Sequence, residues 1–280
     1  MPGIASAATS VVIAHVGAAT QRIRIGSGGI MLPNHAPLVI AEQFGTLEAL
    51  YPGRIDLGLG RAPGTDMRTA RALRRNMAAG TESFPHDILE LKRLLGAPSE
   101  DQALMAVPGM GSHVPLWLLG SSLYSAHLAA ALGLPYAFAS HFAPDQLMEA
   151  ISIYRERFQP SPELDKPYVM VGIMGVAADS DAEAQRLFTS AQQQFVNLRR
   201  NVRKPFPRPV ETMDGIWTEI ERYGVEHTLR YAVVGAANAA RSQLDEFLRV
   251  TGADELIISM PIHALDARLK SAEIFADLRE

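Results

Sequence analysis

The sequence predicts an α/β fold built on a parallel sheet, and two features indicate it. Short apolar runs alternate with longer helical segments along the chain, and strands that alternate with helices form parallel sheets because each parallel pair needs a crossover. Gly, Ser, His and Pro also gather just after strands, as in Gly28-Gly29, Gly60-Arg61 and Ser140-His141. In both the (β/α)8 barrel and the doubly wound sheet, that edge holds the functional site.

The first half of the chain opens on a helix that is rich in Ala, Ser and Val. Strands are recognised by apolar alternation that ends in glycine, and one helix has Pro37 in its first turn and Pro52-Gly53 beyond its end. The predicted order is helix, strand, helix, strand, two helices, strand and helix, at residues 5–20, 22–32, 37–50, 55–60, 65–77, 86–95, 114–120 and 121–132.

The second half continues the alternation, with one excursion at residues 201–209 that contains three prolines. Its predicted order is strand, helix, strand, helix, helix, strand, helix, strand and helix, at residues 136–140, 145–158, 168–177, 181–200, 214–230, 231–234, 238–250, 255–260 and 264–278. No internal repeat or linker interrupts the pattern, so we expect residues 1–280 to form a single domain.

The composition limits the classes of function. A net charge of −4 over 280 residues gives no broad basic field, so neither nucleic acid nor an anionic membrane is expected as a partner. Cysteine is absent, which excludes disulfides and cysteine-based metal sites and fits a cytoplasmic location. No apolar stretch is long enough to span a membrane, and the first residues do not have the pattern of a signal peptide.

The segment from Ile55 to Gly64 is the strongest candidate for a binding site. A buried strand with Gly58 and Gly60 leads directly into Arg61, whose planar donor fork suits a phosphate or a carboxylate. Glycines there would let a ligand approach the backbone. The alternative is an ordinary surface arginine after a strand. The segment is not a dinucleotide-binding fingerprint, because Pro63 stands where its third glycine is required.

Four motifs together resemble one enzyme family. They are Ile25-Gly-Ser-Gly-Gly-Ile-Met-Leu-Pro-Asn-His-Ala-Pro37, Ala41-Glu-Gln-Phe44, Tyr51-Pro-Gly-Arg-Ile-Asp-Leu-Gly-Leu-Gly-Arg-Ala-Pro-Gly64 and Leu118-Leu-Gly-Ser-Ser122. With them, the sequence resembles the bacterial luciferase-like family of flavin-dependent monooxygenases, clearly to about residue 200 and more loosely to the end. The resemblance implies a (β/α)8 TIM-barrel type of fold. A six-stranded doubly wound sheet is the structural alternative.

The resemblance also assigns cofactor-binding roles. Arg61 matches the arginine that binds the phosphate of reduced FMN, and Ser121, Ser122 and Ser125 match its partners at the start of the next helix. A helix N-terminus that carries hydroxyls is independently a suitable anion site, although a single serine could simply cap the helix. Gly28-Gly29 matches a glycine pair that is joined by a cis peptide under the flavin ring.

The resemblance departs from the family pattern at the front of the chain. Members of the family begin with a strand, a helix and a second strand, which supply a catalytic histidine and part of the floor under the flavin. We expect the predicted barrel to lack these three elements. Either the sequence starts inside a longer natural protein, which we favour because the other motifs are intact, or it is a truncated flavoprotein.

Two histidines are candidates for catalysis. His35 and His141 follow predicted strands and would face the substrate side of a flavin, where histidine can move protons near neutral pH. For each, the alternative is a structural loop histidine. The other histidines lie on predicted helices or beside strands, and no spacing among them indicates a metal site.

The resemblance implies an enzyme that uses reduced FMN and O₂ to oxidise a small organic substrate. The sequence has no nicotinamide motif, so a separate flavin reductase is expected as a partner. The alternatives are an F420-dependent oxidoreductase and a non-catalytic flavin-binding protein. A homodimer is also implied, with the small-residue helix at residues 5–20 as its seam.

Overall fold

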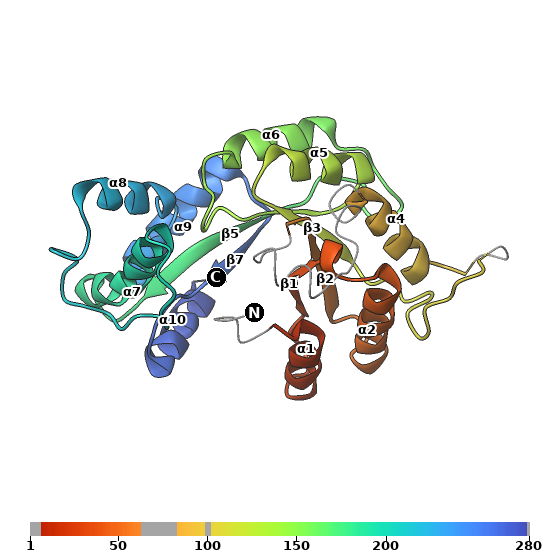
Figure 1. The fold of residues 1–280 in the computed structure, drawn as a ribbon, viewed down its shortest axis with the longest axis horizontal. Helices are drawn as coiled ribbons and strands as arrows, with labels where there is room; N and C mark the ends of the chain where they lie inside the picture. Colours follow the sequence, from red (N-terminus) through yellow and green to blue (C-terminus); the bar gives the residue numbers. More distant parts are fainter. Residues whose placement is uncertain (1–6, 63–82, 99–101, 279–280) are drawn as a thin grey trace. The chain divides into compact units, whose positions relative to one another are not determined.

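The computed structural model describes residues 7–62, 83–98 and 102–278, and these form two compact units (Figure 1). The first unit comprises residues 1–120, 124–136 and 157–167, and the second comprises residues 121–123, 137–156 and 168–280. Each unit has its own strands and helices. The expectation of a single domain over residues 1–280 stays a prediction.

The first unit follows the predicted order of elements. Proline and glycine mark its boundaries so clearly that one helix and one strand have the predicted bounds. The elements are α1 (Thr9–Ala18), β1 (Ile25–Met31), the short 3₁₀ helix η1 (Leu32–Asn34), α2 (Pro37–Leu50), β2 (Ile55–Gly60), α4 (Phe84–Leu95), β3 (Leu116–Gly120) and α5 (Leu123–Leu132). The helix predicted at residues 65–77 lies outside the described residues.

The three strands of the first unit pair in parallel. Met31 of β1 is in register with Gly60 of β2, and Gly60 is in register with Leu119 of β3. The carboxyl ends of the three strands therefore meet at one edge of the sheet. The chain leaves this edge at η1, at Arg61 and at the turn into α5.

Glycine allows α1 to pack closely in the first unit. A side chain at Gly17 would overlap the ring of Tyr51, which follows α2 and donates a hydrogen bond of 2.7 Å to the carbonyl of Ala14. The guanidinium of Arg54 adds hydrogen bonds to the carbonyls of Thr20 at 2.8 Å and Ile23 at 2.9 Å. These contacts join α1 to the turn between α2 and β2.

The second unit is organised around one long strand, β5 (Val169–Ala177). This strand pairs in parallel with β6 (Val233–Gly235) through its carboxyl end and with β7 (Glu255–Ser259) through its preceding part. The remaining elements are β4 (Tyr136–Phe138), which begins in the first unit, α6 (Leu147–Arg157), α7 (Asp181–Arg199), α8 (Glu219–Thr228), α9 (Ala237–Thr251) and α10 (Leu265–Asp277). The predicted excursion at residues 201–209 contains no helix or strand.

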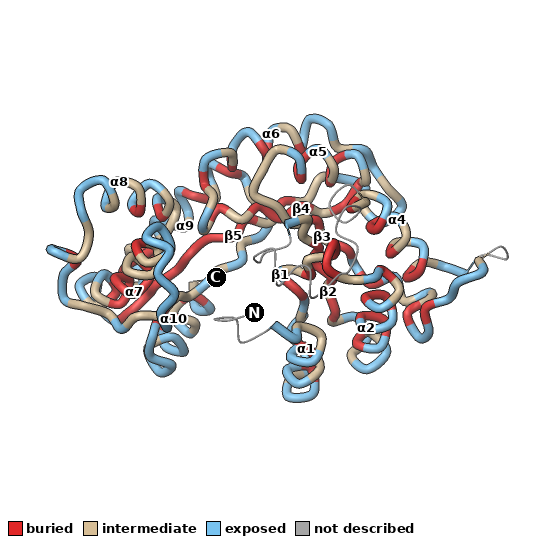
Figure 2. Tube along the Cα trace, in the orientation of Figure 1, coloured by how far each residue is buried: buried red, intermediate tan, exposed pale blue. Residues whose placement is uncertain are grey.

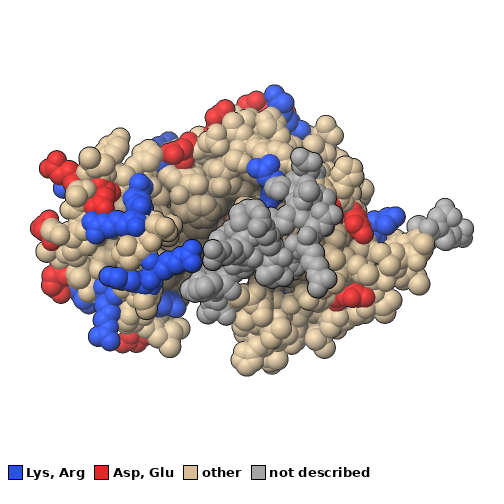
Figure 3. All heavy atoms as spheres, in the orientation of Figure 1, with Lys and Arg blue, Asp and Glu red and all other residues tan. Residues whose placement is uncertain are grey.

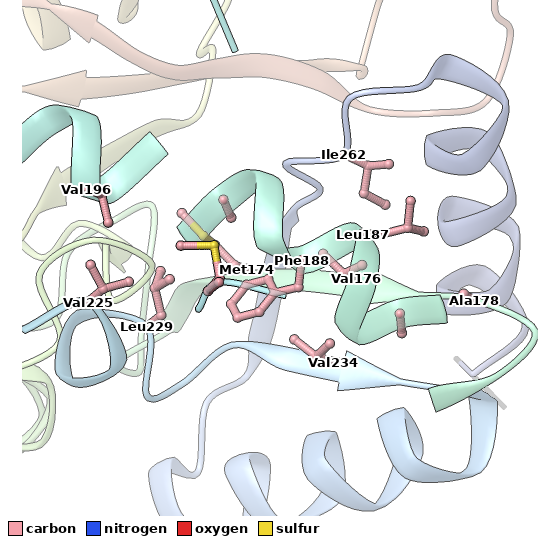
Figure 4. Close-up of a cluster of buried hydrophobic side chains, with 13 residues drawn as sticks. Met174, Val176, Ala178, Leu187, Phe188, Val196, Val225, Leu229, Val234 and Ile262 are labelled. Carbon is pink, nitrogen blue, oxygen red and sulfur yellow. The ribbon is translucent and has the colours of Figure 1, made fainter. Parts of the chain in front are cut away.

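The core of the second unit lies between β5, β6 and α7. Residues of β5 are buried almost without interruption, because the strand is covered on both faces (Figure 2). Phe188 of α7 lies among Met174, Val176 and Val234 (Figure 4). Trp217, which precedes α8, packs against the same cluster.

Basic and acidic side chains both occur over the second unit on the face drawn in Figure 3. None of the described helices is both long enough and apolar enough to cross a membrane.

Candidate functional site

The glycine pair Gly28-Gly29 lies in the middle of β1, at the register shift between Ser27 and Ile30. The peptide bond between Gly28 and Gly29 is cis, as the family resemblance implies. A side chain at Gly29 would come within 2.7 Å of the carbonyl oxygen of Gly58, whereas no described atom lies within 4 Å of the position that a side chain at Gly28 would take. The backbone at Gly28 is therefore open to a flat ligand, while that at Gly29 is packed against β2.

Arg61 directly follows β2, at the carboxyl edge of the first unit's sheet. Its guanidinium lies 3.9 Å from the centroid of the Tyr124 ring, in the first turn of α5. Among the described residues the guanidinium has no hydrogen-bond or ion-pair partner. The structure thus brings together the end of β2 and the start of α5, where no described residue occupies the donors of Arg61.

The first turn of α5 is held in place by contacts on its buried side. Ser125 is buried, and its hydroxyl lies 3.2 Å from the hydroxyl of Tyr136, whose pKa is raised by burial. A side chain at Gly120 would overlap Ser125, so the glycine leaves the space that the serine occupies. In this structure Ser125 supports the turn from inside. Its predicted contact with a phosphate stays a prediction.

The other predicted residues of the site are divided between the units. Ser121 and Ser122 connect β3 to α5 but belong to the second unit, so their contact with the ligand of Arg61 stays a prediction. His35 is half-buried in the first unit, directly after η1, and its backbone N–H donates to the carbonyl of Leu32 at 2.9 Å. His141 lies in the second unit, in the turn that follows β4.

The ring of His141 lies against the backbone of β5. A side chain at Gly172 would come within 2.7 Å of Nδ1 of His141, so only glycine leaves room for the ring. Ser140 is buried and donates a hydrogen bond of 2.8 Å to the carbonyl of Gly172, which holds the turn to the strand. Phe142 contacts the ring edge to face, with centroids 4.7 Å apart. The imidazole is thus held on two sides.

Burial favours the neutral form of His141. Nδ1 is buried and has no hydrogen-bond partner among the described residues. Desolvation lowers the pKa of His141 from its usual 6.5, and the Gly172 backbone offsets part of the change. A neutral imidazole has a lone pair that can accept a proton.

The lowered pKa predicts a specific dependence of stability on pH. The unfolded chain takes up a proton at His141 as the pH falls below about 6.5, while the folded chain resists protonation there, so stability is lost on acidification. We expect the free energy of unfolding to fall less between pH 7.5 and pH 5.5 in His141→Asn than in the wild type. Urea unfolding at the two pH values measures this difference.

A matched control is His86→Asn, which removes an exposed histidine of α4. It should leave the wild-type dependence on pH nearly unchanged, because the buried His141 is still present in this variant. If His141→Asn lost as much stability on acidification as the wild type, His141 would not be the group responsible.

Sequence reasoning missed three supporting residues. Tyr124 was part of the serine-containing segment, but an aromatic residue in a first helical turn does not by itself indicate an arginine partner. Gly172 lies within an apolar strand, where glycine can indicate a close approach of another group. Ser140 directly precedes His141, and in the sequence it indicates only a polar strand end. For all three, the signal depends on a partner that is distant in sequence.

Comparison with known proteins identifies the family. The model of the luciferase-like monooxygenase family matches residues 2–255. A luciferase-like monooxygenase of Escherichia coli K12 is 54% identical over 280 residues, which cover 100% of this chain and 84% of the relative. The uncharacterized protein YvbT of Bacillus subtilis strain 168 is 50% identical over 278 residues, with 99% of this chain and 82% of the relative covered.

Solved structures agree with the predicted fold. The crystal structure of apo-MsnO8 superposes with a TM-score of 0.83 at 32% identity, and covers 96% of this chain and 81% of that one. A type II Baeyer-Villiger monooxygenase, the oxygenating constituent of 3,6-diketocamphane monooxygenase from Pseudomonas putida in complex with FMN, has a TM-score of 0.63 at 17% identity, with 96% and 80% covered. The predicted α/β fold of the TIM-barrel type is confirmed. It takes the place of the alternative, a six-stranded doubly wound sheet. On these grounds, the chain belongs to the luciferase-like monooxygenase family.

Proposed function

We propose that this chain binds reduced FMN at the carboxyl ends of β1, β2 and β3, and that it uses the flavin with O₂ to oxidise a small organic substrate. The observation that carries the proposal is the position of Arg61. Its guanidinium lies over the first turn of α5 and has no hydrogen-bond or ion-pair partner among the described residues. An arginine held in this way is available to an anionic group.

The electrostatics of this corner favour a phosphate. The N-terminal turn of a helix presents backbone N–H groups and the positive end of the helix dipole, and α5 begins here. A planar guanidinium can donate two parallel hydrogen bonds to the same phosphate. The FMN phosphate is nearly a dianion at neutral pH, so both elements would stabilise it. FMN is also the cofactor in a solved complex of similar fold.

The residues around the proposed flavin have separable roles. The open backbone at Gly28 would accept the flat ring, and Arg61 with the start of α5 would hold the phosphate. Reduced flavin would supply the electrons that activate O₂. His35 and His141 would hold or move protons on the substrate, and a neutral His141 is suited to accept one.

Two other functions remain as outcomes of the test. Members of the family use either reduced flavin or F420, so binding of F420 with no binding of FMN would assign the chain to deazaflavin chemistry. A non-catalytic flavin-binding protein would bind FMN but would not consume O₂ in response to any substrate. The proposed separate reductase, the homodimer and the cytoplasmic location are further parts of this proposal.

FMN titration of the wild type and of Arg61→Ala tests the proposed function. We expect saturable binding by the wild type and at least tenfold weaker binding by Arg61→Ala, which corresponds to about 1.4 kcal/mol. The loss is expected because the variant removes the cation and its donor fork together. Quenching of flavin fluorescence measures the affinity, and O₂ consumption with a supplied flavin reductase then measures turnover.

Arg22→Ala is the matched control. Arg22 is exposed and precedes β1, so it lies at the opposite edge of the same parallel strands. The control removes the same charge from the first unit and should change FMN affinity less than twofold, since an exposed charge at that distance is screened by salt. Equal losses in the two variants would refute an assignment of the phosphate to Arg61.

A further inference from the structure

We infer that Tyr124 is a positioning residue for the phosphate of the flavin, because its ring holds the guanidinium of Arg61 at the start of α5. This inference rests on the proposed function. This positioning role differs from the binding roles given to the glycine pair of β1 and to the serines at the start of α5. It requires an aromatic ring that lies against the arginine. The guanidinium carbon lies 3.9 Å from the ring centroid, which is a close stacking distance.

The stacking leaves the arginine ready to bind. When an arginine pairs with a carboxylate, its N–H donors are already occupied by hydrogen bonds and part of its charge is neutralised. The ring of Tyr124 carries no opposite charge and no hydrogen-bond acceptor in its face, so this contact neither neutralises Arg61 nor occupies its N–H groups. The contact therefore fixes the orientation of the guanidinium without competing with an anion.

Other arginines of the first unit show the contrast. Arg24 is bound by both carboxylate oxygens of Asp56, at 2.7 and 2.9 Å. Arg54 donates to backbone carbonyls on either side of the turn before β1. These two side chains have structural partners, whereas the contact of Arg61 among the described residues is the face of an aromatic ring.

The turn that carries Tyr124 is itself well supported. Ser125, the next residue, is buried beneath it and contacts Tyr136, and Gly120 provides the space. Tyr124 as a residue is 38% exposed, so it lies at the surface of the first unit, where the guanidinium of Arg61 is accessible to a ligand. An anchored backbone with an exposed ring is a suitable support for a long, flexible side chain, which would otherwise lose conformational freedom on binding.

The test compares Tyr124→Leu with Tyr124→Phe in titrations with FMN and with riboflavin, which lacks the phosphate. We expect Tyr124→Leu to bind FMN about fivefold more weakly, since that is the range of a surface cation–π contact. Riboflavin binding should be unchanged. Tyr124→Phe should bind FMN as the wild type does, because it keeps the ring and loses only the hydroxyl. In the Arg61→Ala background, Tyr124→Leu should have no additional effect on FMN binding.

Each result separates the inference from the proposed function. If the wild type does not bind FMN, the proposed function fails. If Arg61→Ala weakens FMN binding and Tyr124→Leu does not, only the role of Tyr124 fails. An equal loss in Tyr124→Phe would mean that the hydroxyl contacts the ligand, and an equal loss for riboflavin would mean that the turn was disrupted; either result overturns the positioning role. Tyr124→Ser serves as the second variant if Tyr124→Leu does not fold.

Discussion

Replacement of Gly120 with alanine is expected to weaken FMN binding at least tenfold and to lower the free energy of unfolding by about 2 kcal/mol, the usual range for overpacking. The added methyl group would overlap both the hydroxyl oxygen and the β-carbon of Ser125. Ser125 cannot retreat easily, because it is buried against Tyr136. The first turn of α5 must therefore shift, and Tyr124 and the guanidinium of Arg61 would shift with it.

A double variant provides the control for this prediction. Gly120→Ala combined with Ser125→Gly removes the side chain that the new methyl group would overlap, so Gly120→Ala should cost less FMN affinity in the Ser125→Gly background than in the wild type. Fluorescence titration and urea unfolding of both variants measure the two effects. If Gly120→Ala bound FMN as tightly as the wild type, FMN affinity would not depend on the position of the first turn of α5, and the prediction would be wrong.

Phe188→Ala is expected to lower the free energy of unfolding of the second unit by about 3–5 kcal/mol. Phe188 is buried among Met174, Val176 and Val234. Removal of its ring leaves a cavity, because the backbone of the surrounding strands and helix cannot move far enough to fill it. Phe188→Leu keeps most of the volume and should cost much less. Comparison of the two variants separates the cost of the cavity from the cost of replacing the phenylalanine with any other residue.

The two tryptophans allow the second unit to be followed by itself. Trp217 packs against the cluster that contains Phe188, whereas Trp117 belongs to β3 of the first unit. In a Trp117→Phe background, the fluorescence of Trp217 during urea unfolding reports on the core of the second unit. If Phe188→Ala lowered the free energy of unfolding by less than about 1 kcal/mol, the packing described above would be contradicted, because so small an effect is typical of an exposed side chain.

Much of the secondary structure could be predicted because its signals are local. The bounds of α2 and β2 agree with the prediction, since Pro37, Pro52 and Gly53 act on the backbone of their immediate neighbours. The long strand β5 was also expected, because its apolar residues form a continuous run. Predictions were less accurate where such punctuation is weak, as in the region before α8, where only residues 219–228 are helical.

The sequence by itself determined the order of strands and helices and the family, and it proposed Arg61 as the candidate cation. Each of these depends on residues that are neighbours in the chain or on a matching motif. Only the tertiary structure decided that Arg61 lies on Tyr124, that Ser125 supports α5 from inside and that His141 lies against Gly172. Each of these contacts joins residues from different elements. Their partners are selected by the register of parallel strands and by the space that glycines leave, and neither can be read from a local pattern.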